Sequence, residues 1–68
     1  MKSISGKELA RALERSGWLL KRVQGSHHIY AKPGHDARIS VPVLGNQTLK
    51  TGLCAHLLKM AGLREEDI

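Results

Sequence analysis

Apolar residues recur at helical spacing near the start of the chain. The positions that share one face are Leu9, Ala12, Leu13 and Ser16, and a second face holds Lys7, Arg11 and Arg15. Ser5 and Glu8 have the spacing of a capping box, in which each residue satisfies a backbone amide at the helix start. Gly17 suits a left-handed residue after the last turn. The pattern therefore predicts a helix over residues 6–16.

A second helical pattern lies near the end of the chain. Its apolar positions share one face and are Cys54, Leu57, Leu58 and Ala61. Thr51 is placed to cap this helix and Gly62 to end it. Leu63 can then fold back onto the last turn, as residues after a glycine stop often do.

Three short segments between the two helices have the composition of β-strands, over residues 18–23, 27–31 and 38–41. The sequence Gln24-Gly25-Ser26 separates the first two segments, and the turn-forming residues 33–36 separate the second from the third. Two tight connections favour an antiparallel meander.

The predicted order is α-β-β-β-α, an α+β fold in a single domain over residues 1–68. Each helix has one apolar side, so both are expected to pack on the same face of a three-stranded antiparallel sheet. The other face is then open to solvent or to a partner. A chain this short buries a modest core, so any active site should lie on the surface.

Composition excludes several classes of protein. Cys54 is the only cysteine, so no internal disulfide can form and an oxidised secreted mini-protein is excluded. No apolar run approaches the roughly 18 residues of a membrane span, and the first residues lack the apolar core of a signal peptide. We expect a cytoplasmic protein that is a monomer when free and makes no membrane contact.

Basic residues outnumber acidic ones, and they do so unevenly. Residues 1–63 hold ten basic and three acidic side chains, a balance of +7, whereas residues 64–68 hold one and three. This balance favours a polyanionic partner such as a nucleic acid. The alternative is a basic surface that only keeps a small protein soluble.

Two adjacent histidines, His27 and His28, lie in the second predicted strand and must point to opposite faces of the sheet. Gly25 and Ser26 ahead of them offer backbone amides and a hydroxyl to an anion. The cations on or beside the same strands are Lys21, Arg22, Lys32 and Arg38. An imidazole can take a proton from a ribose 2′-hydroxyl near neutral pH while cations hold the phosphate, so the set suits metal-independent phosphodiester cleavage. A packing or surface role is the plain alternative for a strand histidine.

Other chemistries have less support in the sequence. Cys54 and His56 are two residues apart on a helix and match no zinc spacing, so neither a metal nor a cofactor is expected. Cys54 should fill the core, although a nucleophilic Cys/His pair stays open. Trp18 and Tyr30 are the only aromatic residues, too few for a base-stacking platform. Trp18 is expected to anchor the core, and Tyr30 fits either the core or an RNA contact.

Several segments together resemble the HicA toxin family, and they cover nearly the whole chain in order and spacing. They are Lys7-Glu8-Leu9, Leu13-Glu14, Gly17-Trp18, the run Gly25-Ser26-His27-His28-Ile29-Tyr30, Val41-Pro42-Val43 and Leu58-Lys59-Met60-Ala61-Gly62-Leu63. The chain departs from the family pattern at Leu44, where a histidine is frequent. It departs again at Gly52-Leu53-Cys54-Ala55, where the family often has Gly-Thr-Leu-Arg.

The resemblance implies a fold like that of a double-stranded RNA-binding domain. It also implies an mRNA endoribonuclease that arrests translation and is neutralised by a HicB-like antitoxin. The family's functional histidine follows Gly-Ser and maps onto His27, with Gly25 in the same motif and His28 as a second candidate. We expect RNA contacts from Gly25, Ser26, Lys21, Arg22, Tyr30, Lys32 and Arg38.

Three functions remain open at this point: the ribonuclease, an RNA-binding module without catalysis, and a subunit that binds only protein. For the ribonuclease, His27 is the general base and should be partly exposed at the sheet edge. The general acid that protonates the leaving 5′-oxygen is His28, a lysine or water.

Overall fold

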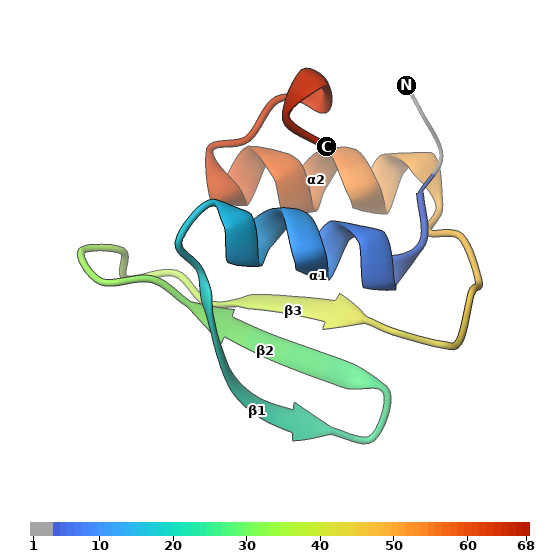
Figure 1. The fold of residues 1–68 in the computed structure, drawn as a ribbon, viewed down its shortest axis with the longest axis horizontal. Coiled ribbons are helices and arrows are strands. Elements are labelled where there is room, and N and C mark those ends of the chain that lie inside the picture. Colours follow the sequence, from blue (N-terminus) through green and yellow to red (C-terminus); the bar gives the residue numbers. More distant parts are fainter. Residues whose placement is uncertain (1–3) are drawn as a thin grey trace.

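Two helices cover one face of a three-stranded antiparallel sheet, and the opposite face of the sheet is left uncovered (Figure 1). The computed structural model describes residues 4–68; residues 1–3 of the predicted domain lie outside the described part. The elements run α1 (Gly6–Arg15), β1 (Leu19–Gln24), β2 (His27–Ala31), β3 (Ile39–Pro42), α2 (Thr51–Ala61) and a 3-10 turn, η1 (Glu65–Asp67). The predicted α+β fold and element order are confirmed. The likeness to a double-stranded RNA-binding domain stays a prediction.

Helix α1 begins and ends as its sequence predicts. The Ser5 hydroxyl accepts a hydrogen bond from the Glu8 amide at 3.1 Å, and the Ser5 amide donates to the Glu8 carboxylate, which completes the capping box. At the other end Gly17 has a φ of 96°. The Trp18 amide reaches back to the Leu13 carbonyl at 3.0 Å. This left-handed stop turns the chain directly into β1.

Helix α2 begins one residue earlier than expected. Thr51 is its first helical residue rather than its cap, and Lys50 occupies the cap position without a side-chain hydrogen bond to the helix. The end follows the prediction: Gly62 has a φ of 70°, and the Leu63 amide bonds back to the Leu58 carbonyl at 2.9 Å.

The sheet is a meander in the order β1-β2-β3. Gln24 pairs with His27, so β1 and β2 are joined by a two-residue turn. Gly25 supplies the positive φ of 58°, and Ser26 keeps a negative φ. This combination matches a type II′ turn, whose first central position favours glycine. The register shifts between Leu20 and Arg22, where one extra residue forms a β-bulge.

The connection from β2 to β3 is longer than the tight turn that the sequence suggests. A turn with Pro33 and Gly34 at its centre is closed by a hydrogen bond from the His35 amide to the Lys32 carbonyl at 3.0 Å. The chain then continues without regular structure to Ile39. Arg38 therefore lies in this loop, and its assignment to a strand is wrong. The His35 ring lies 5.3 Å from the Trp18 ring, which ties the loop to the start of β1.

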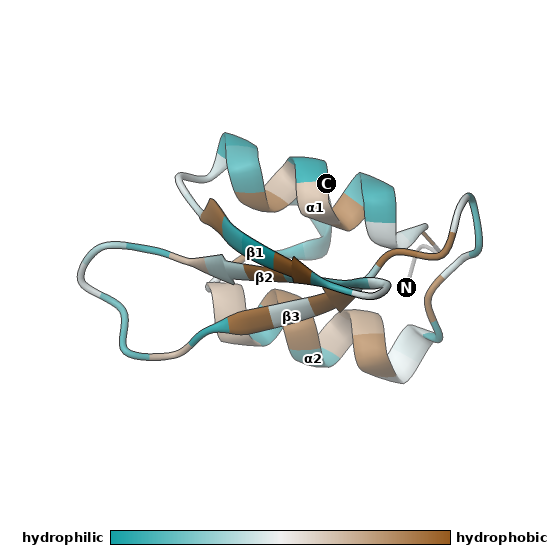
Figure 2. Ribbon diagram, turned by 90° about the horizontal axis from the view of Figure 1, so that it is seen from below, coloured by the Kyte–Doolittle hydropathy of each residue, from teal (hydrophilic) through white to brown (hydrophobic). Residues whose placement is uncertain are grey.

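One hydrophobic core fills the space between the helices and the sheet. The largest fully buried side chains are Trp18, Tyr30, Ile4, Leu9, Leu13, Ile39, Val41 and Cys54. The apolar faces predicted for both helices supply much of this core, as do Trp18 and Cys54. In Figure 2 the strand β3 is hydrophobic along most of its length, whereas β1 has a hydrophilic middle between hydrophobic ends.

The segment between β3 and α2 is held to the N-terminal side of the molecule. The Leu49 amide donates to the Ile4 carbonyl at 2.8 Å, and Ser5 forms an isolated bridge with Thr48. The Val43 amide donates to the Ser26 carbonyl at 2.7 Å. Figure 1 accordingly shows the β1–β2 turn, the end of β3 and the first turns of both helices at one end of the molecule.

Candidate functional site

The uncovered face of the sheet can be identified from strand register. Tyr30, Ile39 and Val41 are buried, so they point toward the helices. Strand alternation then places their neighbours on the other side. The residues of this open face are Leu19, Arg22 and Gln24 of β1, His27, Ile29 and Ala31 of β2, and Ser40 and Pro42 of β3. No acidic residue of the described chain lies in a strand, so carboxylates are absent from this face.

His27 lies on the open face at the first position of β2 and is exposed to solvent. Its Nδ1 atom lies 3.2 Å from the Ser40 hydroxyl oxygen of β3, within hydrogen-bonding distance. Within residues 4–68 no hydrogen bond is made to Nε2. The expected exposure of His27 is confirmed. Its expected place at the sheet edge is not: β2 is the central strand, and His27 is the first residue of that strand.

The bulge in β1 changes which cations share the open face. In a regular strand Lys21 and Arg22 would point to opposite sides. The extra residue breaks this alternation: Arg22 pairs with Ile29, an open-face position, and Lys21 lines a hollow with the open-face residues Leu19 and Ala31. Arg22 is then the diagonal neighbour of His27, at a Cα separation of roughly 7–8 Å that a long side chain can span.

Lys21 and Lys32 lie toward the end of the sheet opposite to His27, and the Lys32 side chain passes close to Gly17. Together with Leu19, Ala31 and Pro33 they line a shallow hollow of about 180 Å³. This end lies four residue steps along β2 from His27, or roughly 13 Å. Arg38 is exposed in the loop before β3 and does not line this hollow. The structure thus gathers three of the four predicted cations along β1 and the end of β2.

Gly25 and Ser26 have a structural role in the hairpin turn that precedes His27. Gly25 is exposed, and no atom of the described residues outside its immediate neighbours lies within 4 Å of a side chain built on it. The turn is therefore open on its outer side. The Ser26 carbonyl is already used by Val43, which fixes the position of His27 relative to the chain after β3.

His28 lies on the side of the sheet opposite to His27. It pairs with Val41, a fully buried residue, and is itself half-buried. Directly opposed residues of an antiparallel pair share a face. The structure therefore does not bring the two histidines together on one face of the sheet.

Tyr30 belongs to the core, which resolves the two roles that its sequence position allows. It is 1% exposed, and its hydroxyl donates a hydrogen bond to the Glu14 carboxylate of α1 at 2.9 Å. Burial, together with this hydrogen bond and the negative charge of Glu14, raises the pKa of Tyr30 to about 12. With no exposed surface, Tyr30 is left out of the RNA-contacting set.

The structure also bears on two alternatives from the sequence, a nucleophilic Cys54 and a metal site. Cys54 is buried in the core, and burial with the nearby Glu65 carboxylate raises the pKa of its thiol. A raised pKa disfavours the nucleophilic thiolate. Among residues 4–68, no group of three or more histidine, cysteine or acidic side chains is arranged to hold a metal ion.

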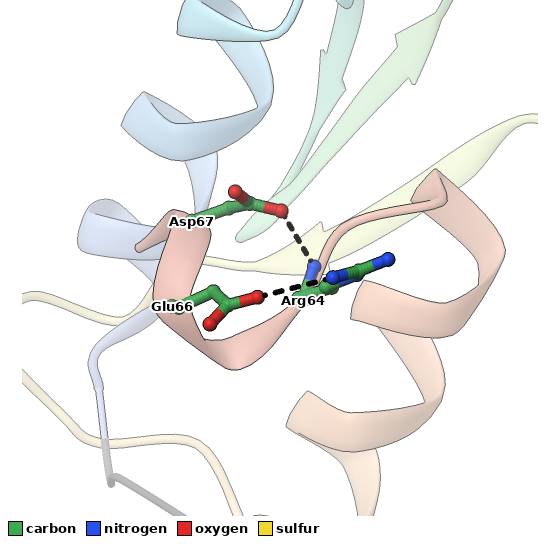
Figure 3. Close-up of polar contacts among 3 residues, drawn as sticks. All are labelled: Arg64, Glu66 and Asp67. Carbon is green, nitrogen blue, oxygen red and sulfur yellow. Dashed lines mark hydrogen bonds and ion pairs between the residues drawn. The ribbon is translucent and has the colours of Figure 1, made fainter.

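The acidic tail folds over the helices, away from the open face (Figure 1). In η1 the Arg64 amide donates to the Asp67 carboxylate at 2.8 Å, and the Arg64 guanidinium forms an exposed ion pair with Glu66 at 3.4 Å (Figure 3). Ile68 packs against the core. The layer of helices therefore separates the tail carboxylates from the basic sheet, and the positive potential of the open face is not cancelled locally.

Two features of the site, the approach of Ser40 to His27 and the bulge, are not predicted from the sequence. Ser40 is the polar position of an alternating strand, which signals an outward-facing residue. Its pairing with Ile29, and hence its approach to His27, depends on strand register. The bulge leaves no clear mark in the sequence Leu19-Leu20-Lys21-Arg22.

A protein-family model described as HicA toxin of bacterial toxin-antitoxin matches residues 6–63. The match includes both helices, all three strands and every open-face residue named above. The comparison with curated proteins finds no match. No helix within residues 4–68 is long and apolar enough to cross a membrane.

Proposed function

The chain belongs to the HicA toxin family of bacterial toxin–antitoxin systems, and on this premise we propose that it is a metal-independent endoribonuclease that cleaves mRNA and so arrests translation. The observation that supports the proposal most directly is the exposed His27 on a basic sheet face, with one ring nitrogen at Ser40. The cytoplasm, where mRNA is translated, is the compartment in which this activity would operate.

In the proposed reaction His27 acts as the general base. When Nδ1–H donates to the Ser40 hydroxyl, the lone pair of Nε2 faces solvent and can accept the proton of a ribose 2′-hydroxyl. The 2′-oxygen then attacks the adjacent phosphorus, and the 5′-oxygen leaves with a proton from water or a lysine. Arg22, the diagonal neighbour of His27, is suited to stabilise the charge that develops on the phosphate.

The remaining cations would hold the RNA strand rather than the reacting phosphate. Lys21 and Lys32 line one hollow toward the other end of the sheet, where they can bind a phosphate further along the RNA. Gly25 and Ser26 at the open outer side of the hairpin turn, and Arg38 beside β3, complete the proposed RNA contacts. No cofactor or metal enters this scheme.

Cleavage of a labelled RNA in EDTA tests the proposal. We expect the wild-type protein to cut the RNA and His27→Ala to be inactive, with a free energy of unfolding within about 1 kcal/mol of the wild type. His56→Ala is the matched control, since His56 is exposed on α2. RNA binding without cleavage in the wild type would favour the non-catalytic module. An RNA affinity that is absent even at low salt would favour a subunit that binds only protein.

The partner that we propose is a HicB-like antitoxin that covers the open face. A site with no lid can be closed only by another chain, and a basic face attracts an acidic or neutral surface. We expect the complex to bury His27 and at least two of the four cations, which a footprint by hydrogen exchange or cross-linking would detect. If the complex is inactive while His27 stays accessible to solvent, the antitoxin must instead inhibit allosterically, by binding α1 or α2.

A further inference from the structure

A partly open hollow of about 350 Å³ lies at the end of the molecule that carries His27. Its apolar wall includes Pro42 at the end of β3, Leu44 in the following loop and Leu53 in the first turn of α2. Leu44 and Leu53 are 53% and 40% exposed, so both leave apolar surface open to a ligand. The volume falls within the range of roughly 300–1,000 Å³ that is usual for small-molecule sites.

The hollow is joined to the proposed catalytic position through Pro42. Pro42 is the direct β-partner of His27, and opposed residues in such a pair have Cα atoms about 5 Å apart. The hydrogen bond from the Val43 amide to the Ser26 carbonyl joins the chain after β3 to the turn before His27. The hollow and His27 are therefore held in a fixed relation by the backbone.

The polar groups around the hollow match a nucleotide better than an aliphatic side chain. Gln47 and Thr48 bring an amide and a hydroxyl, which can donate to and accept from the edge of a base. Lys50 adds a positive charge beside them, at the uncapped start of α2. An apolar floor with a few hydrogen-bonding groups and one cation fits a planar base attached to a phosphate.

We infer that this hollow binds one base of a single-stranded RNA and so selects the position of the cut. The inference rests on the proposed function, because it assigns the base next to the ribose whose 2′-hydroxyl His27 deprotonates. The RNA would then run from Lys21 and Lys32, past Arg22 and His27, to the hollow, along the length of β2. Base selection at one end and phosphate contacts at the other would fix the register of the strand.

Binding can be tested without any cleavable substrate. The four nucleoside monophosphates contain no phosphodiester bond to cut, and ribose 5-phosphate and inorganic phosphate serve as probes without a base. We expect at least one nucleotide to shift the methyl signals of Leu44 and Leu53 in an NMR titration, and the probes without a base to leave them unmoved. Equal shifts from phosphate alone, or shifts confined to other residues, would overturn the inference.

A pair of double variants tests the link to cleavage. Leu44→Ala with Leu53→Ala should weaken binding of the preferred nucleotide roughly three- to tenfold and flatten the cut-site preference on a mixed-sequence RNA. The matched control is Leu20→Ala with Val23→Ala, whose side chains are 43% and 52% exposed on the helix side of β1 and do not line the hollow.

The outcomes separate the two proposals. Cleavage by the wild type with an unchanged cut-site preference in the Leu44/Leu53 variant would reject the base-binding role and leave the ribonuclease intact. Nucleotide binding in the hollow by a protein that cuts no RNA would reject the ribonuclease and keep the base site. Leu44 and Leu53 signals that respond to an antitoxin and to no nucleotide would make the hollow an anchor for a protein side chain.

Discussion

At the scale of single residues, the proposed chemistry depends on how the His27 ring is held. An exposed imidazole on a strand can rotate, and only one rotamer presents Nε2 to a substrate. Ser40 is the single described side chain that forms a hydrogen bond with this ring, at 3.2 Å. It acts through His27, so we regard it as a positioning residue.

Removal of the Ser40 hydroxyl should lower the rate of the chemical step. We expect Ser40→Ala to reduce kcat roughly tenfold with little change in KM, because the substrate still binds but the base is less well aligned. Ser40→Thr, which retains a hydroxyl, should recover much of the loss. An equal fall in kcat for both variants would mean that the substitutions act by disturbing the strand rather than by releasing the ring.

Tyr30 makes the stability of the folded protein depend on pH in the alkaline range, and its titration can be measured directly. Its folded pKa is about 12, above the ordinary value near 10, so the folded state keeps the phenol proton that the unfolded state releases first. The stability from this proton is fully present below pH 10 and is lost as the pH rises from about 10 to about 12. Because the chain has one tyrosine, absorbance titration of tyrosinate reports this group alone.

The comparison with Tyr30→Phe isolates this effect. Near pH 8 the wild type should be more stable by about 0.5–1.5 kcal/mol, the usual net value of a hydrogen bond such as that to Glu14. The difference between the two urea midpoints should shrink as the pH rises from about 10 to about 12. A tyrosinate transition at pH 10 in the folded protein would contradict the buried position of the hydroxyl.

At the scale of elements, the end of β3 and the start of α1 approach so closely that only glycine fits. A side chain at Gly6 would overlap the Pro42 carbonyl oxygen and approach the Pro42 carbonyl carbon to 3.0 Å. Both contacts are to backbone, which cannot swing aside as a flexible side chain can. Pro42 also lines the hollow and pairs with His27, so a shift of Pro42 would be felt at the candidate site.

Gly6→Ala should therefore destabilise the fold, by about 1–3 kcal/mol or more, because α1 must move off β3. Gly52→Ala in the first turn of α2 is the matched control, since a side chain there meets no atom within 4 Å. That change should be neutral or stabilise the protein by up to about 1 kcal/mol. Thermal unfolding of the two variants would measure the difference, and equal melting temperatures would show that α1 can shift freely.

The sequence predicts the positions of the helices and strands better than it predicts the register and contacts between them. Capping residues and glycine stops are local signals, so the ends of α1, the end of α2 and the bounds of β2 agree with expectation within a residue. Strand register is set by contacts between distant residues, which is why the Ser40–His27 contact was not foreseen. The bulge at Lys21 likewise moves one cation to the other face without a local sequence signal.

Gly6 and Leu44 show the same difference between local signals and long-range contacts at the candidate site. Gly6 looks like an ordinary helix start in the sequence, and its contact with Pro42 exists only in three dimensions. Leu44 appears as a departure from a family pattern, and only the fold shows that it lines a hollow with Leu53. The sequence could identify His27 as a candidate because the chemistry of an imidazole is a property of the residue itself.

At the scale of the whole molecule, the carboxylates lie outside the strands, whereas cations occur both in the sheet and in the helices. The chain has a net charge of +5, and its six acidic residues lie in α1, in the loop before β3 and in the tail. The uncovered side of the sheet is left with cations and no carboxylates. An RNA strand approaching this side meets an attractive field, which is screened beyond about 8–10 Å at physiological salt.

The salt dependence of RNA binding should reveal how many of these cations meet phosphates. In a His27→Ala background, which prevents cleavage, Lys21→Gln with Arg22→Gln should lower the slope of log K against log salt by about 1.4, from two lost contacts on a single strand. Lys7→Gln with Arg11→Gln removes the same charge from the exposed side of α1 and should leave the slope nearly unchanged. Equal slopes for the two double variants would mean that RNA does not bind over β1.

The position of β1 has a consequence for how the protein behaves at high concentration. All six residues of this edge strand are exposed, and three of them are Leu19, Leu20 and Val23. An uncovered edge with apolar side chains is a template for strand pairing between chains and hence for aggregation. Lys21 and Arg22 interrupt the apolar run, and the bulge twists the edge away from a flat partner. The same pair of cations that we assign to RNA thus keeps the protein from adding copies of itself to its own sheet.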